Sequence, residues 1–216
     1  MKKGIYLFLV SLFIISVQSC NSDEQTAQSA DNKTYPDSLE IYFPPLDFTD
    51  KIHIHHWAWG DEGNSIFKGN LIPQSWLKKH LTNDVFKLEE DEDYYGIFYI
   101  KELNSLLIRN RVSLADHMQQ TFLLAYDKEK GVTHIKKVAS YFGAEGFINQ
   151  SASWIIRSDS TIEMMMRNNN WSIKPDIGET STDSIRVYRF ENNIFAKQST
   201  KGTTSALKKQ FPFLDD

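Results

Sequence analysis

Residues 94–198 contain four pairs of strand-like runs, and this pattern constrains the fold more than any other feature of the sequence. Each run is rich in β-branched and aromatic residues, and the two runs of a pair are joined by a short segment holding Asn, Asp, Ser or Gly, as β-turns do. The joining segments are residues 102–105, 128–131, 158–160 and 191–193. The sequence therefore predicts a mainly β fold, an antiparallel meander of hairpins. A sandwich, a barrel and a propeller-like arrangement all fit this pattern.

Two more strands are expected before the hairpins, at residues 39–43 and 51–59. Both segments are rich in Ile, Phe, Tyr or Trp, which are enriched in strands. The chain has 13% aromatic residues, enough to build a sizeable core, and residues 38–216 have the length of one domain. We therefore expect a single β-rich globular domain over residues 38–216.

One short helix is expected from Pro73 to Leu81. Proline is tolerated at the start of a helix, and Trp76, Leu77 and Leu81 would form an apolar stripe at helical spacing.

Three further segments are expected to connect or end the strands. Residues 143–146 are expected to form a turn between hairpins, and residues 168–170 a loop. Residues 206–213 would form either a single helical turn or a loose C-terminal tail.

The first seventeen residues have the layout of a secretory signal. Lys2 and Lys3 precede an apolar run of 13 residues, Ile5 to Val17, which is short of the roughly 20 residues that a membrane-spanning helix needs. A positive start followed by a short apolar run is typical of a signal peptide. We expect residues 1–19 to be the signal peptide.

The next motif, Val17-Gln18-Ser19-Cys20, resembles the lipobox of bacterial lipoproteins. In that family an aliphatic residue stands three positions before a cysteine, and a small residue stands directly before it. The resemblance implies cleavage between Ser19 and Cys20, a diacylglycerol on the Cys20 sulfur, and acylation of the new amino group by a fatty acid such as palmitate. An ordinary signal peptide and an uncleaved anchor are the alternatives. Because Cys20 is the only cysteine, a lipidated chain would have no intramolecular disulfide and no thiol nucleophile.

Residues 21–24, Asn-Ser-Asp-Glu, resemble the signal that sends Bacteroidota lipoproteins to the outer face of the outer membrane. The resemblance implies an outer-membrane location with the domain on the cell surface, and a periplasm-facing domain is the alternative. The polar composition of residues 21–36 predicts a flexible tether, whose root-mean-square reach would be roughly 20 Å. Residues 20–37 are thus expected to be the lipidated cysteine and its tether.

Charge makes a nucleic-acid partner unfavourable. The chain has a net charge of −4, and loss of Lys2 and Lys3 with the signal changes it to −6. No Lys- and Arg-rich stretch of the kind that binds phosphates is present in the sequence.

The segment His53-Ile54-His55-His56-Trp57-Ala58-Trp59 contains half of the six histidines. In a strand, His53, His55, Trp57 and Trp59 would share one face. They form a candidate binding face, because exposed tryptophans can stack on a sugar or anchor a protein partner. Two histidines at this spacing could also hold zinc or copper with Asp61 or Glu62. Packing of this face into the core is the third interpretation, and the one that we favour, so no metal site is predicted.

Residues 89–93 are five consecutive acidic residues. Calcium loops place their ligands at alternating positions and need a glycine at the bend, which this run lacks. The run therefore indicates a solvated connection, with a calcium site as the less favoured alternative.

Ser75 and Lys78 have the Ser-x-x-Lys spacing of penicillin-binding enzymes, but the other motifs of that family are missing from the sequence. No phosphate-binding loop occurs either, so no catalytic residue and no cofactor are predicted. We expect a non-catalytic, lipid-anchored binding module for a protein, a glycan or another envelope component. One alternative is an envelope inhibitor or immunity protein, in which residues 89–93 would fill the basic active site of a toxin or cell-wall hydrolase. The other is a hydrolase that uses carboxylates or a metal.

Overall fold

The computed structural model describes residues 38–48, 50–55, 68–89, 91–112, 118–174 and 176–213. The expected signal peptide, the lipid site at Cys20 and the tether lie outside these residues, as do Trp57 and Trp59.

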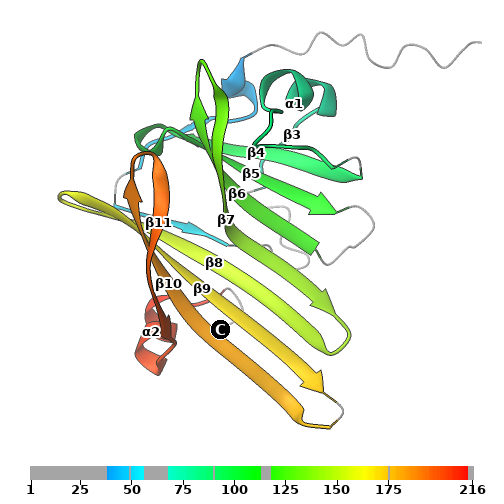
Figure 1. Ribbon diagram of the computed structural model, residues 1–216, viewed down its shortest axis with the longest axis vertical. Coiled ribbons are helices and arrows are strands. Elements are labelled where there is room, and N and C mark those ends of the chain that lie inside the picture. Colours follow the sequence, from blue (N-terminus) through cyan, green and yellow to red (C-terminus); the bar gives the residue numbers. More distant parts are fainter. Residues whose placement is uncertain are drawn as a thin grey trace, which may run out of the picture. The chain divides into compact units, whose positions relative to one another are not determined.

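One eleven-stranded sheet dominates the domain (Figure 1). Its order is β1-β4-β5-β6-β7-β8-β9-β10-β11, with β2 beside β8 and β3 beside β4. The strands are β1 (Pro45–Leu46), β2 (Lys51–Ile54), β3 (Asn70–Leu71), β4 (Glu92–Ile100), β5 (Ser105–Val112), β6 (Met118–Asp127), β7 (Gly131–Ala144), β8 (Phe147–Ser158), β9 (Thr161–Lys174), β10 (Gly178–Glu191) and β11 (Ile194–Gly202). The β1–β4 pair is parallel and the other pairs are antiparallel. The predicted mainly β meander is confirmed, and within the described residues its path is open, with no pairing between β1 and β11.

All four predicted hairpins are present, as β4–β5, β6–β7, β8–β9 and β10–β11. In three of their turns a residue has a left-handed backbone, namely Asn104, Gly131 and the pair Asn192 and Asn193. In the β10–β11 turn, Asn192 and Asn193 have φ values of 52° and 64°, a pair of positive angles that suits the right-handed twist of a hairpin. The turn signals read from the sequence therefore correspond to backbone geometry.

Strand β7 is shared unequally between its neighbours, and this makes room for β2. It pairs with β6 along most of its length but with β8 only from Ser140 to Ala144. Beyond that point β2 takes its place, pairing with β8 from Ser153 to Ile156. Ile52 and Ile54 of β2 are buried in the same apolar cluster as Ile155 of β8.

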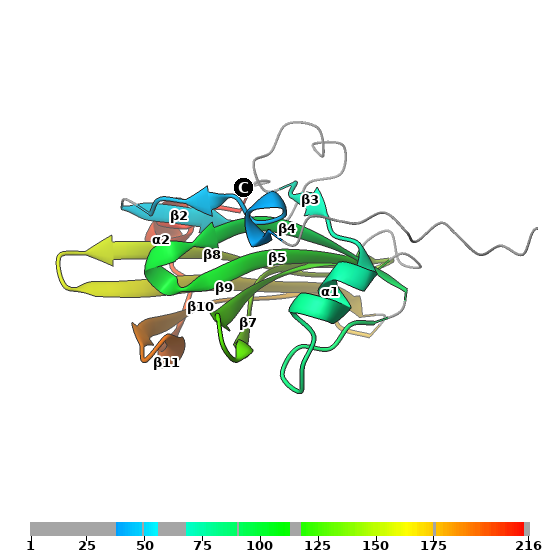
Figure 2. The same ribbon diagram turned by 90° about the horizontal axis from the view of Figure 1, so that it is seen from above.

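Helix α1 (Gln74–His80) matches the predicted helix. Pro73 lies just before its first residue, and Trp76, Leu77 and Leu81 are all buried, as expected. The Trp76 ring packs against Tyr42, with 4.8 Å between ring centroids. Figures 1 and 2 both show α1 next to the β4–β5 part of the sheet, whereas the second helix, α2 (Ser205–Gln210), lies near β8 and β10.

The strand predicted at residues 39–43 is wrong, because this segment begins with a 3₁₀-helix, η1 (Leu39–Ile41). The Tyr42 and Phe43 amides both donate to the Leu39 carbonyl. Both side chains are buried, which breaks the alternation of a strand, and the two prolines that follow have no N–H to give to a sheet.

The loop predicted at residues 168–170 is also wrong, because these asparagines lie inside β9. Asparagine favours turns, but here each one faces a polar residue of β10, namely Ser184, Asp183 and Thr182. Polar cross-strand neighbours keep this end of the strand paired.

The C-terminal segment forms α2 and then packs on the sheet, so the helical alternative is correct and residues 206–213 are not loose. Phe211 and Phe213 are buried against Trp154 and Ile185. Two hydrophobic anchors thus hold the end of the described chain to β8 and β10.

Arg167 of β9 also holds the C-terminal segment, through contacts with Phe211 and Phe213. Its guanidinium makes a two-pronged contact with Asp183, at 3.1 Å from Nε to Oδ1 and 2.8 Å from Nη2 to Oδ2. Nη1 donates to the Phe211 carbonyl at 2.9 Å, and the Phe213 ring centroid lies 4.2 Å from the guanidinium carbon. The arginine side chain is only 1% exposed, so protein groups rather than water compensate its charge.

Candidate functional site

The histidine strand adopts the predicted facing over its described residues. His53 stacks on Trp154 of β8 with 4.5 Å between ring centroids, and the His55 ring is 5.1 Å from that of His53. Ile52 and Ile54, which point to the other side, are buried. The prediction that His53 and His55 share a face is confirmed, whereas their partners Trp57 and Trp59 fall outside the described residues.

The environment of His53 keeps its imidazole neutral. Burial lowers its pKa to about 4, and the charges of His55 and Lys51 act in the same direction. Its Nε2 atom is buried and has no hydrogen-bond partner among the described residues. In the described part of the chain, no group of three or more His, Cys, Asp or Glu side chains could hold a metal ion. Asp61 and Glu62, the expected third ligands, lie outside the described residues.

We expect this histidine to make folding stability depend on pH. Between pH 6.5, the ordinary pKa of histidine, and about 4, the unfolded chain binds a proton that the folded chain does not. The contribution of the neutral His53 to the free energy of unfolding is therefore fully present above pH 6.5. It falls as the pH is lowered towards 4, by at most about 3 kcal/mol. Urea unfolding at several pH values measures this loss. His53→Phe, which keeps a ring against Trp154, should flatten the profile, and equal slopes for both proteins would contradict the prediction.

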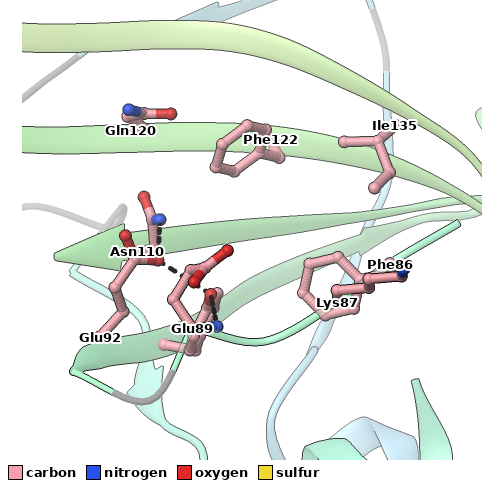
Figure 3. A pocket seen from close by; sticks show the side chains of 9 residues that line it. Phe86, Lys87, Glu89, Glu92, Asn110, Gln120, Phe122 and Ile135 are labelled. Atoms are coloured by element: carbon pink, nitrogen blue, oxygen red, sulfur yellow. Dashed lines mark hydrogen bonds between the residues drawn. The ribbon is translucent and has the colours of Figure 1, made fainter. Parts of the chain in front are cut away.

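A pocket of about 270 Å³ lies between the sheet and the segment that follows α1 (Figure 3). Its lining residues are Phe86, Lys87, Glu89, Glu92, Tyr94, Asn110, Gln120, Phe122 and Ile135. Tyr94 of β4 lies opposite Asn110 of β5, which lies opposite Gln120 of β6. Because directly opposed residues point to the same side of a sheet, register alone brings these three polar side chains into one row.

The carboxylate of Glu92 is at the centre of a hydrogen-bond network in this pocket. Asn110 Nδ2 donates to its Oε2 at 2.5 Å, and the Tyr94 hydroxyl donates to the same oxygen at 2.9 Å. The backbone N–H of Glu89 donates in turn to the Tyr94 hydroxyl at 3.2 Å. Burial raises the pKa of Tyr94 to about 12, and the hydrogen bond and charge of Glu92 contribute in the same direction, although the Glu89 N–H opposes them. Tyr94 therefore remains a donor throughout the physiological range.

This network fixes the orientation of the Asn110 amide. Only the nitrogen of the amide can donate to a carboxylate, so the oxygen, Oδ1, must point the other way. This oxygen is buried and has no hydrogen-bond partner among the described residues. Asn110 as a whole is 6% exposed. A buried acceptor left without a donor costs about 1–3 kcal/mol, which makes Asn110 an unusual residue for a core position.

The sequence prediction missed this site. The acidic run 89–93 was expected to be a solvated connection, yet Glu92 begins β4 and its carboxylate lies beside Asn110 (Figure 3). The same carboxylate accepts a hydrogen bond from Tyr94. Asn110 belongs to a strand that was predicted correctly, but no local signal marks an asparagine whose partner is eighteen residues away. Only the alternation of strand residues could have placed Tyr94, Asn110 and Gln120 on one side.

No helix in the described residues is long and apolar enough to cross a membrane. Comparisons of the chain with protein-family models, with curated proteins and with solved structures found no match. Function must therefore be argued from the chemistry of the pocket and of the N-terminal motif.

Proposed function

We propose that this chain is a lipid-anchored protein of the outer membrane whose β domain is a non-catalytic binding module, with the pocket around Asn110 as its ligand site. The anchor is proposed from the lipobox-like motif that ends at Cys20, and display on the cell surface from residues 21–24. The polar tether would let the domain reach roughly 20 Å from the membrane.

The observation that carries the binding proposal is that Asn110, a residue that lines the pocket, has an oxygen without a hydrogen-bond partner among the described residues. This oxygen is itself buried, so a ligand in the pocket reaches it only when the side chain shifts. An uncompensated polar group in a folded protein calls for an explanation, and a ligand that supplies the missing donor is one. A volume of about 270 Å³ lies just below the roughly 300–1,000 Å³ of typical small-molecule sites. The pocket therefore suits one end of a glycan, a peptide or another envelope component.

The inhibitor alternative depends on acidic side chains that reach outward. Glu92, a central member of the acidic run, instead spends one carboxylate oxygen on Asn110 and Tyr94. This orientation removes Glu92 from a projecting acidic plug, whereas Glu89, Asp91 and Asp93 are exposed and leave the inhibitor alternative open.

Asn110→Leu tests the proposed ligand site, because leucine keeps the approximate volume and removes the amide. We expect a soluble panel of envelope saccharides, muropeptides and amines to include a ligand that stabilises the full-length protein by about 2.7 kcal/mol at 100 times its dissociation constant. Asn110→Leu should weaken binding of this ligand about tenfold or more. The variant loses the proposed contact of Oδ1 with the ligand and the hydrogen bond from Nδ2 to Glu92. Thermal unfolding with and without each ligand measures the effect.

The matched control is Asn170→Leu, which removes an exposed amide of β9 away from the pocket. It should respond to the ligand as the unchanged protein does. A panel in which nothing stabilises the unchanged protein more than Asn110→Leu would remove the basis for the binding proposal.

A further inference from the structure

We infer that the group recognised in the Asn110 pocket is a primary ammonium, carried by a lysine side chain or by an amino sugar. The inference rests on the proposed binding function and adds to it the chemistry of the ligand. It follows from three properties of the pocket wall, namely its free acceptors, its charge and its aromatic rings.

The wall formed by Glu92 and Asn110 has more acceptors than donors. The Tyr94 hydroxyl and Asn110 Nδ2 both donate to Glu92 Oε2. That leaves Asn110 Oδ1 without a partner, and the described residues give no hydrogen bond to the second oxygen of Glu92. A ligand must therefore bring donors to this wall.

An ammonium group fits this requirement better than a hydroxyl. It has three N–H donors and no acceptor, so none of its atoms needs a donor from the wall. A sugar hydroxyl would also bring lone pairs, and for these the Glu92–Asn110 wall offers only the second hydrogen of Asn110 Nδ2, because the Tyr94 hydroxyl already donates to Glu92.

The charge of the residues that line the pocket also favours an ammonium group. Glu89 and Glu92 line the pocket with one cationic residue, Lys87. Figure 3 shows Lys87 on the side of Phe86, away from Asn110 and Glu92. The wall with the free acceptors is therefore anionic, which attracts a cation and repels a carboxylate or phosphate.

Three aromatic rings, those of Phe86, Tyr94 and Phe122, line the same pocket. Phe86 and Tyr94 meet edge to face, with 6.0 Å between their centroids. Aromatic rings attract ammonium groups electrostatically, and Phe122 and Ile135 offer an apolar surface to the carbon chain that carries the nitrogen. Carboxylates and rings together thus complement both parts of an alkylammonium.

The test is calorimetric titration of the full-length protein in detergent micelles with two matched pairs of probes. The first pair is Nα-acetyl-lysine N-methylamide and its neutral analogue, Nα-acetyl-norleucine N-methylamide. The second pair is glucosamine and N-acetylglucosamine. We expect the charged member of at least one pair to bind about tenfold or more tightly than the neutral member, because a hydrogen bond to a charged group is worth about 1.5–3 kcal/mol. The pair with the tighter charged member identifies the source of the ammonium.

Glu92→Gln should weaken the charged probe about tenfold or more, because it removes the charge but keeps the shape. Glu129→Gln makes the same change on the exposed β6–β7 turn and should leave the affinity unchanged. The comparison of charged and neutral probes on the unchanged protein needs no variant, so a misfolded Glu92→Gln does not weaken the test.

Neutral probes that bind as tightly as the charged ones would overturn the ammonium inference and leave the binding proposal standing. So would charged probes that do not bind, if other members of the envelope panel still distinguish the unchanged protein from Asn110→Leu. Failure of every probe and of the whole panel would overturn both.

Discussion

Arg167→Met is expected to lower the free energy of unfolding by as much as about 3–5 kcal/mol, because it leaves the buried Asp183 carboxylate with only one cationic partner, the half-exposed Lys208. The side chains of Arg167 and Asp183 are 1% and 8% exposed. The Phe211 carbonyl would lose its donor in the same change. Urea unfolding measures the loss, and we expect the C-terminal segment to become sensitive to proteolysis.

The matched control for this prediction is Arg189→Met. Arg189 is also on a strand and pairs with Glu163 at 3.4 Å, but its side chain is 47% exposed, and such surface pairs contribute less than about 1 kcal/mol. The double variant Arg167→Met/Asp183→Leu should regain part of the lost stability, because it leaves no buried charge unpaired. Similar losses for Arg167→Met and Arg189→Met would show that the buried pair has no special role.

The Arg167–Asp183 ion pair should also lose its stabilising effect in acid. Partial burial on its own would raise the pKa of Asp183, but hydrogen bonds from Arg167 and Thr203 and the charges of Arg167 and Lys208 outweigh it and hold the pKa below the ordinary value of 3.8. Because the folded-state pKa is the lower one, the stabilisation is complete above about pH 4 and is lost as the pH falls through that folded value. The difference between the unchanged protein and Arg167→Met should therefore narrow in strong acid.

Local pattern was sufficient to predict the hairpins and α1. In each hairpin the strands and the turn are neighbours in the sequence, so the residues that decide the structure stand together, as Asn192 and Asn193 do at the β10–β11 turn. The same argument explains the failure at residues 39–43, where the composition of a strand is overridden by burial of Tyr42 against Trp76, over thirty residues away.

The functional candidates show the same division between local and distant information. The shared face of His53 and His55 follows from strand alternation, but the stacking of His53 on Trp154 depends on β2 taking a place beside β8. Likewise, Glu92, Tyr94 and Asn110 meet only because β4 and β5 pair in one register. Pairing register between distant segments is not written in the composition of either strand, so neither Arg167 nor Asn110 could be singled out from the sequence.

Cys20→Ala is expected to move the protein from the membrane fraction to the soluble fraction. Each buried methylene of an acyl chain contributes about 0.8 kcal/mol, and a single myristoyl chain gives only marginal binding, so the two or three chains that the lipobox implies would account for almost all of the membrane affinity. Ultracentrifugation after a carbonate wash measures the distribution, and mass spectrometry of the intact protein measures the lipid.

Ser22→Ala is the matched control, because it changes a neighbouring residue and keeps the sulfur. This variant should stay in the membrane fraction with its lipid, although its exposure to protease on intact cells tests the surface signal. If Cys20→Ala instead stays in the membrane after the wash, residues 1–19 would be the anchor. The apolar run would then remain on the variant as an uncleaved segment, because Cys20→Ala also removes the cleavage motif. The intact mass of the unchanged protein decides the lipid proposal: an unmodified Cys20 would make it wrong, while the pocket and its ligand chemistry would be untouched.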